Sequence, residues 1–153
     1  MTTVQIIIEI NAPIEKCFDL ARDAAFHVET ARETGERIVA GKAVGLFELG
    51  DEVTFEGRHL GVRQRLSARI VEFEAPYRFV DEMTRGVFRS LRHVHQFEEL
   101  GEVKTRMTDI VSWVSPLGLL GFVADKVAVE RHMRQFLRQR SERIKKRAER
   151  GLE

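Results

Sequence analysis

The chain has 153 residues, a formal net charge of +1 and one cysteine, Cys17. The length fits a single domain over residues 1–153, the lone cysteine excludes an intrachain disulfide, and the small net charge gives no indication of nucleic-acid binding. Because no run approaches the roughly 18 apolar residues of a membrane span and the N-terminus is unlike a signal peptide, we expect a cytoplasmic protein.

The N-terminal part of the chain predicts one strand followed by two short helices. Residues Val4–Ile10 are apolar and mostly β-branched, which is typical of a strand, and Asn11-Ala12-Pro13 ends this run. An apolar stripe from Ile14 to Ala21 then predicts a short helix, and a second is expected over Ala24–Ala31.

Six further strands follow, separated by turns that contain glycine or proline. They are expected over Glu36–Ala43, Glu52–Arg58, Val62–Phe73, Tyr77–Met83, Val87–Glu98 and Val103–Trp113. The turns are expected near Gly45, Gly50-Asp51, His59-Leu60-Gly61, Glu74-Ala75-Pro76, Thr84-Arg85-Gly86 and Leu100-Gly101-Glu102. Successive strands with such short connections form an antiparallel meander.

A long helix is predicted to close the chain, from Leu117 to about Arg150. No proline occurs in it, and apolar residues recur at helical spacing at Val129, Met133, Phe136-Leu137 and Ile144. A meander has one face that needs covering, and this helix is the element long enough to cover it. The order β-α-α-β6-α therefore predicts an α+β helix-grip fold, a curved antiparallel sheet of about seven strands around the C-terminal helix.

A helix laid across a strongly curved sheet leaves a space that suits a ligand. The odd-numbered residues of Val87–Glu98 are the more apolar set, so we assign them to the concave face, and the same alternation is applied to the neighbouring strands. The side chains expected in the cavity are Phe79, Asp81, Arg89, Leu91, His93, His95, Phe97, Met107, Asp109, Val111 and Trp113, with Met133 from the helix.

Two opposite-charge pairs are expected among these side chains. With a turn centred near Gly101, His93 falls opposite Asp109, and a facing pair of this kind can hold one imidazole tautomer. The preceding turn brings Asp81 close to Arg89. Since a buried charge is costly unless it is paired, these groups either satisfy one another or present polar atoms to a ligand.

Other polar residues have an ambiguous position. In the third strand Glu56, Arg58 and the following His59 either line the mouth of the cavity or are polar residues near a turn. His27 and Glu29, in the second short helix, either stand at the cavity entrance or form a solvated pair.

The sequence lacks a glycine-rich phosphate loop and a G-x-S-x-G motif. His93-x-His95 with Asp109 has the donor types of a metal site, but the same residues equally form a hydrogen-bonded pair, so neither a metal nor a cofactor is expected. Residues Arg131 to Arg150 include nine Arg or Lys against two Glu. This excess either binds an anionic partner or is a solvated helix end that the helix dipole favours.

The whole chain resembles the START-like or SRPBCC superfamily, which includes Bet v 1-like proteins and polyketide cyclase/dehydrase proteins. The resemblance rests on the opening strand with Ile10-Asn-Ala-Pro-Ile-Glu-Lys-Cys-Phe-Asp-Leu20, the meander and the long closing helix. It is similar to a bacterial branch in Gly50-Asp-Glu-Val-Thr-Phe-Glu-Gly-Arg-His-Leu-Gly61, Pro76-Tyr-Arg-Phe-Val-Asp-Glu82, His93-Val-His-Gln-Phe97, Thr105-Arg-Met-Thr-Asp109 and Ser115-Pro-Leu-Gly118. The resemblance implies a ligand cavity rather than a fixed catalytic set, and it allows a homodimer.

Three functions remain open at this point. The first is binding of a small hydrophobic or amphipathic molecule between the sheet and the C-terminal helix. The second is a cyclase or hydrolase type of enzyme, in which His93, tuned by Asp109, acts as general base and Arg89 stabilises an enolate or oxyanion. The third is an interaction module that contacts a protein or the ribosome through the basic helix end.

Overall fold

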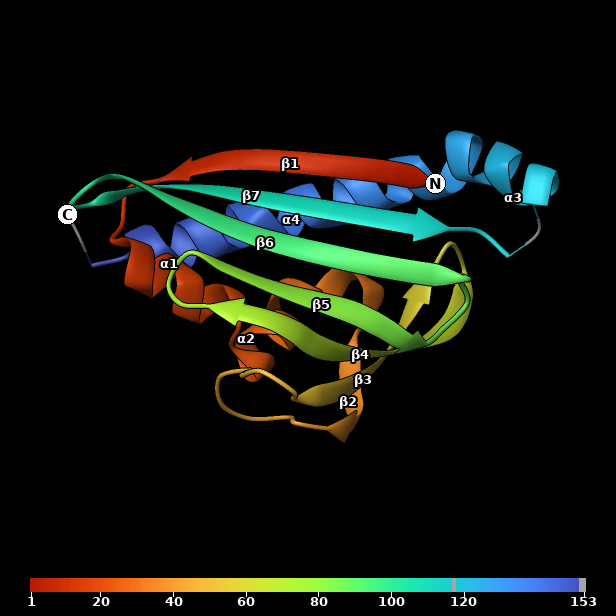
Figure 1. Ribbon diagram of the computed structural model, residues 1–153, viewed down its shortest axis with the longest axis horizontal. Coiled ribbons are helices and arrows are strands. Elements are labelled where there is room, and N and C mark those ends of the chain that lie inside the picture. The colour runs from red at the N-terminus through yellow and green to blue at the C-terminus, as the bar shows by residue number, and fades with distance from the viewer. Residues whose placement is uncertain (117, 152–153) are drawn as a thin grey trace.

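A curved antiparallel sheet of seven strands lies against a long C-terminal helix (Figure 1). The computed structural model describes residues 1–116 and 118–151. The strands are β1 (Thr2–Ile10), β2 (Arg37–Gly41), β3 (Glu52–His59), β4 (Val62–Glu74), β5 (Arg78–Arg85), β6 (Ser90–Gly101) and β7 (Lys104–Val114). Their order across the sheet, β1-β7-β6-β5-β4-β3-β2, is a meander with β1 added beside β7. The predicted helix-grip fold is confirmed.

Two short helices connect β1 to β2. They are α1 (Ile14–Ala21) and α2 (Ala24–Thr30), followed by a 3₁₀ turn over Arg32–Thr34. Asp23 caps α2, since its carboxylate accepts a hydrogen bond from the Phe26 backbone N–H at 2.9 Å.

The C-terminal helical region is divided into three parts. Helix α3 (Gly118–Ala124) leads through a π-helical turn over Asp125–Val129 into α4 (Glu130–Glu149). The sequence predicted one continuous helix from Leu117, a residue that lies outside those described. Among the described residues, no helix is both long and apolar enough to cross a membrane.

Helix α4 lies against the concave face of the sheet, with α1 and α2 near one of its ends and α3 beyond the other (Figure 1). Near α1 the interior is filled by aromatic rings: Phe18 makes edge-to-face contacts with Phe73, Phe79 and Phe97 at centroid distances of 5.4 to 5.6 Å. Such pairs each contribute about 0.5–1.5 kcal/mol beyond their burial. A second buried cluster surrounds Trp113, which is fully buried.

The turn between β6 and β7 differs from the predicted one. A bulge lies between Glu99 and Gly101, and the turn consists of residues 102 and 103. The pairing therefore shifts by two residues, and His95 rather than His93 lies directly opposite Asp109. The side chains keep their face, because a shift of two preserves the alternation.

The connection between β5 and β6 is also longer than predicted. Strand β5 continues to Arg85 and β6 begins only at Ser90, so Asp81 pairs in register with His93. Arg89 lies in the intervening loop, where its side chain is exposed. The expected Asp81–Arg89 contact does not form.

Candidate ligand-binding cavity

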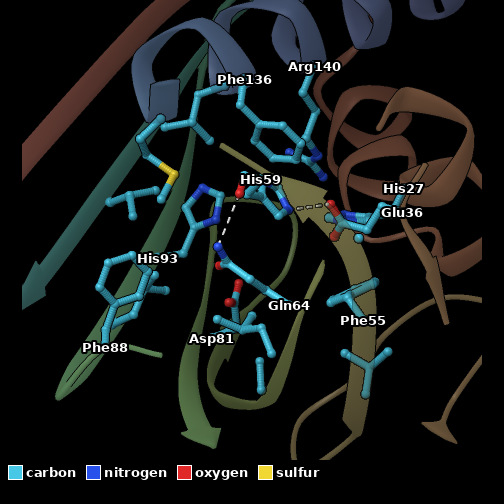
Figure 2. A pocket seen from close by; sticks show the side chains of 18 of the residues that line it. His27, Glu36, Phe55, His59, Gln64, Asp81, Phe88, His93, Phe136 and Arg140 are labelled. Atoms are coloured by element: carbon cyan, nitrogen blue, oxygen red, sulfur yellow. Dashed lines mark hydrogen bonds and ion pairs between the residues drawn. The ribbon is translucent and has the colours of Figure 1, made fainter. Parts of the chain in front are cut away.

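A cavity of about 250 Å³ lies between the concave face of the sheet and α4 (Figure 2). Its walls are mainly apolar, because the inward residues of five strands and one face of α4 meet there. The apolar lining includes Val53, Phe55, Leu66, Ala68, Ile70, Phe79, Leu91 and Val111 from the sheet, and Val129, Met133, Phe136 and Leu137 from the π-helical turn and α4.

The degree of exposure of the lining residues indicates where the cavity opens. Leu60, in the β3–β4 turn, is 52% exposed, and Val87, in the β5–β6 loop, is 47% exposed. Arg140, on the same wall as Leu137, is only 3% exposed. The cavity therefore runs from an opening beside Leu60 and Val87 to a closed inner end beside Arg140.

All five histidines of the chain line this one cavity. They are His27, His59, His93, His95 and His132, and they come from α2, β3, β6 and α4. Histidine suits such a position because its ring packs against apolar groups while its nitrogens donate or accept hydrogen bonds.

One polar group, which we call the His–Asp cluster, consists of Asp81, His93, His95 and Asp109. His93 Nε2 is 2.9 Å from Asp109 Oδ1, and His95 Nε2 is 2.9 Å from Asp81 Oδ2. His95 Nδ1 also lies 3.0 Å from Asp109 Oδ1, so its ring stands between two carboxylates. Ser141 of α4 donates a hydrogen bond to Asp109 Oδ2 at 3.2 Å, which ties the helix to the sheet.

The two histidines of this cluster have pKa values shifted in opposite directions. Burial lowers the pKa of His93, and the neighbouring charge of His95 lowers it further. Burial also acts to lower the pKa of His95, but the contacts with Asp109 and Asp81 outweigh it, and that pKa is raised. The cluster therefore favours a charged His95 beside a neutral His93.

Both carboxyl groups of the cluster favour the ionised form. Burial acts to raise the pKa of Asp109, but the hydrogen bonds and charges of His93 and His95 hold that pKa well below its usual range. Asp81 shows the same balance, with burial opposed chiefly by the hydrogen bond from His95, and its pKa is lowered. The charges of these groups are paired with one another, as expected of buried charges, although His95 Nδ1 makes no hydrogen bond to a described residue.

A second polar group, the His–Glu cluster, consists of His27, Glu36, His59 and His132. Glu36 lies 3.2 Å from His27 Nε2 and 3.7 Å from His59 Nε2, and His59 Nδ1 is 2.9 Å from His132 Nε2. The Glu36 side chain is only 8% exposed, and burial acts to raise its pKa, but the hydrogen bonds from the two histidines lower it to about 2. Burial, and then the charge of His59, lower the pKa of His132.

The residues predicted for the cavity fall into three groups. Those that line it are Phe79, Asp81, Leu91, His93, His95, Val111 and Met133. Those on the predicted face but buried behind the lining are Phe97, Met107, Asp109 and Trp113. Those outside it are Glu56, Arg58 and Arg89.

Glu56 and Arg58 are outside because the alternation of β3 places them on the convex face. Glu56 is hydrogen-bonded by Arg37 and Arg65, which lower its pKa to about 2, and Arg63 also contacts it. The inward positions of the strand instead include Phe55 and His59.

Sequence reasoning missed several lining residues on α4 and before β2. Arg140 lies on the apolar stripe of the helix, between Leu137 and Ile144. A charged residue at such a position could have indicated a buried polar group facing the cavity. Glu36 and His132 gave no comparable signal. The expected pair of His27 and Glu29 is not formed. His27 contacts Glu36 instead.

Three side chains have the spacing of a metal site. Asp81, His93 and His95 each offer one ligand atom, and these atoms lie within 4.8 Å of one another. Each of these side chains already has a partner within the cluster, since His93 contacts Asp109 and His95 contacts Asp81. The set therefore serves better as a hydrogen-bonded network.

Much of the basic charge of α4 is used within the fold. Arg143 donates a hydrogen bond to the Thr30 carbonyl oxygen at 2.7 Å and pairs with Glu33. Arg147 pairs with Glu29 at 2.8 Å. These contacts attach α4 to the α2 region.

Comparison with known proteins adds evidence on the fold. No protein-family model and no curated protein matches the chain. Solved structures do match. A protein of Thermus thermophilus has a TM-score of 0.78 and 18% identity, with 96% of this chain and 97% of that chain covered.

Two further matches carry descriptive names. An aromatase/cyclase of a Streptomyces species has a TM-score of 0.78 and 10% identity, covering 99% of this chain and 96% of that one. A START superfamily protein of Mycobacterium smegmatis has a TM-score of 0.68 and 16% identity, covering 93% and 98%. The chain therefore has the START-like helix-grip fold.

Proposed function

We propose that the protein binds a small hydrophobic or amphipathic molecule in the cavity between the sheet and α4. The observation that carries the proposal is the mainly apolar cavity of about 250 Å³, closed at one end, into which polar groups from several elements converge. Ligand sites commonly combine apolar walls with a few placed polar groups that fix orientation. Here the apolar walls include Leu91, Val111 and Met133, and the polar groups include His93 and Asp81.

The first test is native mass spectrometry of freshly purified protein, followed by denaturation and identification of any released molecule. A stoichiometric small molecule is expected. In parallel, N-phenyl-1-naphthylamine, an uncharged apolar dye, is titrated into the protein, and its fluorescence is expected to rise on binding.

A variant that narrows the cavity makes this test specific. Leu66 lines the cavity, so Leu66→Trp is expected to weaken dye binding at least about tenfold, through lost volume. Leu49, which is 63% exposed, gives a matched control, and Leu49→Trp is expected to bind like the wild type. Equal loss in both variants, or no dye binding to the wild type, would count against the proposal.

A second candidate function is a cyclase or hydrolase type of enzyme. The observation that favours it is His93, which lines the cavity, contacts Asp109 and has a lowered pKa. A neutral imidazole held by a carboxylate has the form of a general base. The aromatase/cyclase with the same fold also supports this candidate.

The two functions give different results for His93→Ala. A binding protein is expected to lose affinity for its co-purified molecule only modestly, and to return that molecule unchanged after incubation. If the protein is an enzyme, the wild type is expected to convert the molecule. The His93→Ala variant is then expected to bind the molecule without converting it. Mass analysis of the incubated mixture distinguishes them.

A further inference from the structure

Arg140 is a charged residue on the face of α4 that otherwise carries apolar, buried side chains. It lies three residues after Leu137 and four before Ile144, both of which are buried. Its own side chain is 3% exposed and extends from α4 into the cavity (Figure 2).

The guanidinium group is only partly satisfied by the protein. Nη2 donates a hydrogen bond to the Ala21 carbonyl oxygen at 2.8 Å. Nε and Nη1 are buried and have no hydrogen-bond partner among residues 1–116 and 118–151. A guanidinium group offers five N–H donors in a planar fork, and buried polar groups of folded proteins are nearly always paired. Two nitrogens of this cavity-lining side chain therefore lack an acceptor within the described part of the protein.

The carboxylates around the cavity do not fill this role, because each already has other partners. Glu36 contacts His27 and His59, and Asp81 contacts His95. Within the described part of the chain, no carboxylate oxygen lies within 4.0 Å of the Arg140 guanidinium nitrogens. The other cations of α4 near it differ in this respect, since Arg143 has an acidic partner.

We propose that the ligand of this cavity carries an anionic group of the carboxylate type, which binds Arg140 at the closed inner end. The inference rests on the proposed binding function and specifies the chemistry of the ligand. Guanidinium and carboxylate groups form strong charge-assisted hydrogen bonds, and Nε and Nη1 supply the free donors.

The apolar wall fixes the direction of the rest of the ligand. Leu137, Phe136 and Met133 follow Arg140 along the lining face of α4 toward the opening. An apolar chain or ring system that starts at Arg140 lies against these residues. The ligand is therefore an amphipathic anion that enters with its charged end first.

The experiment uses a matched pair of competitors, decanoate and 1-decanol, which share a chain length and differ in charge. Each displaces N-phenyl-1-naphthylamine from the full-length protein at neutral pH. Decanoate is expected to displace the dye at a lower concentration than 1-decanol, although the alcohol is the more apolar of the two. An uncharged cavity end would give the opposite order, since burial of an unpaired carboxylate is unfavourable.

Two variants assign the preference to Arg140. Arg140→Met removes the charge and keeps an unbranched side chain, and it is expected to reduce the ratio of decanoate to decanol affinity by at least about tenfold. Arg140→Lys is expected to retain part of the preference. Arg138 is exposed on the same helix, and Arg138→Met is the control that leaves the ratio unchanged.

The outcomes separate the two proposals. If the dye does not bind to the wild type, the proposed binding function fails. If the dye binds but decanol competes as well as decanoate, the anionic ligand is ruled out while the binding function stands. Should Arg140→Met not fold, as judged by circular dichroism, the wild-type order of the two competitors alone decides.

Discussion

Glu36 is a buried carboxylate whose charge depends on two histidines. Its pKa is lowered from 4.5 to about 2, which means that folding favours the ionised form. A depressed carboxyl pKa contributes stability that is fully present above the unfolded pKa and is lost as pH falls through the folded value. The window for this loss is therefore pH 4.5 down to about 2.

The free energy of unfolding of the wild type is expected to fall by about 3 kcal/mol more than that of Glu36→Gln across this window. Urea denaturation at several pH values across the same window measures the difference. Glu29→Gln is the control, because Glu29 is exposed and pairs with Arg147 at the surface. Parallel acid profiles for the wild type and Glu36→Gln would contradict the assignment.

Asp109 is fully buried and accepts contacts from both histidines of the His–Asp cluster and from Ser141. Asp109→Asn keeps the shape but removes the charge that stabilises His95. Breaking a buried pair in this way is expected to lower the free energy of unfolding by about 3 kcal/mol. Urea denaturation near neutral pH provides the measurement.

The matching surface pair is Lys42 with Asp51, whose side chain is 30% exposed. Asp51→Asn is expected to cost less than about 1 kcal/mol, because solvent screens a partly exposed pair. Similar losses for the two asparagine variants would show that the His–Asp cluster does not stabilise the fold.

At the level of elements, the alternation of apolar residues was enough to predict the strands and the inward face of β5, β6 and β7, whereas the facing of β3 was left open and Glu56 and Arg58 lie on its convex face. The five alternate residues of β7, from Thr105 to Trp113, are all buried, as their pattern indicated. The register between strands was harder to predict, because it depends on turn geometry. The bulge at Glu99–Gly101 placed His95 opposite Asp109 without changing the face of either residue, whereas the long loop before Ser90 took Arg89 out of the sheet.

The candidate site was predicted only in part, because alternation along a strand does not indicate which distant segments meet at the cavity. Residues on β5, β6 and β7 could be placed by alternation, whereas Glu36 and His132 reach the cavity only through the curvature of the sheet and the crossing of α4. No short-range pattern encodes these contacts. Arg140 is the exception, since its position on the apolar stripe of α4 is visible in the sequence.

The end of the edge strand β2 depends on Gly41. Its φ is +80°, and a Cβ atom there would lie 2.2 Å from the Glu52 carbonyl oxygen of the neighbouring strand. Gly41→Ala is expected to lower the free energy of unfolding by about 3 kcal/mol, since both backbone strain and overlap must be relieved.

Gly50 provides a control that has the backbone strain of a positive φ but not the steric overlap. It also has a positive φ, of +86°, but a Cβ atom there meets nothing within 4 Å. Gly50→Ala is expected to cost about 1 kcal/mol, and urea denaturation compares the two. A Gly41→Ala variant as stable as Gly50→Ala would mean that β2 tolerates displacement from β3.

On the scale of the whole molecule, the unfilled space between the sheet and α4 lowers the stability of the free protein. The rings around Phe18 fill the interior near α1, whereas the part near Leu66 and Leu91 is left open. Apolar side chains that face a cavity lose dispersion contacts, so cavity-filling substitutions commonly stabilise a protein at a cost in function.

Leu66→Trp is therefore expected to raise the free energy of unfolding of the ligand-free protein by about 1 kcal/mol while it weakens binding. A ligand at a hundred times its dissociation constant stabilises the wild type by about 2.7 kcal/mol, and the variant is expected to lose most of this gain. Urea denaturation with and without N-phenyl-1-naphthylamine measures both quantities, with Leu49→Trp as the control. A Leu66→Trp variant that is less stable than the wild type would contradict the idea that the tryptophan fills an empty volume. A variant that is still stabilised by the dye as much as the wild type would contradict the assignment of this cavity as the binding site.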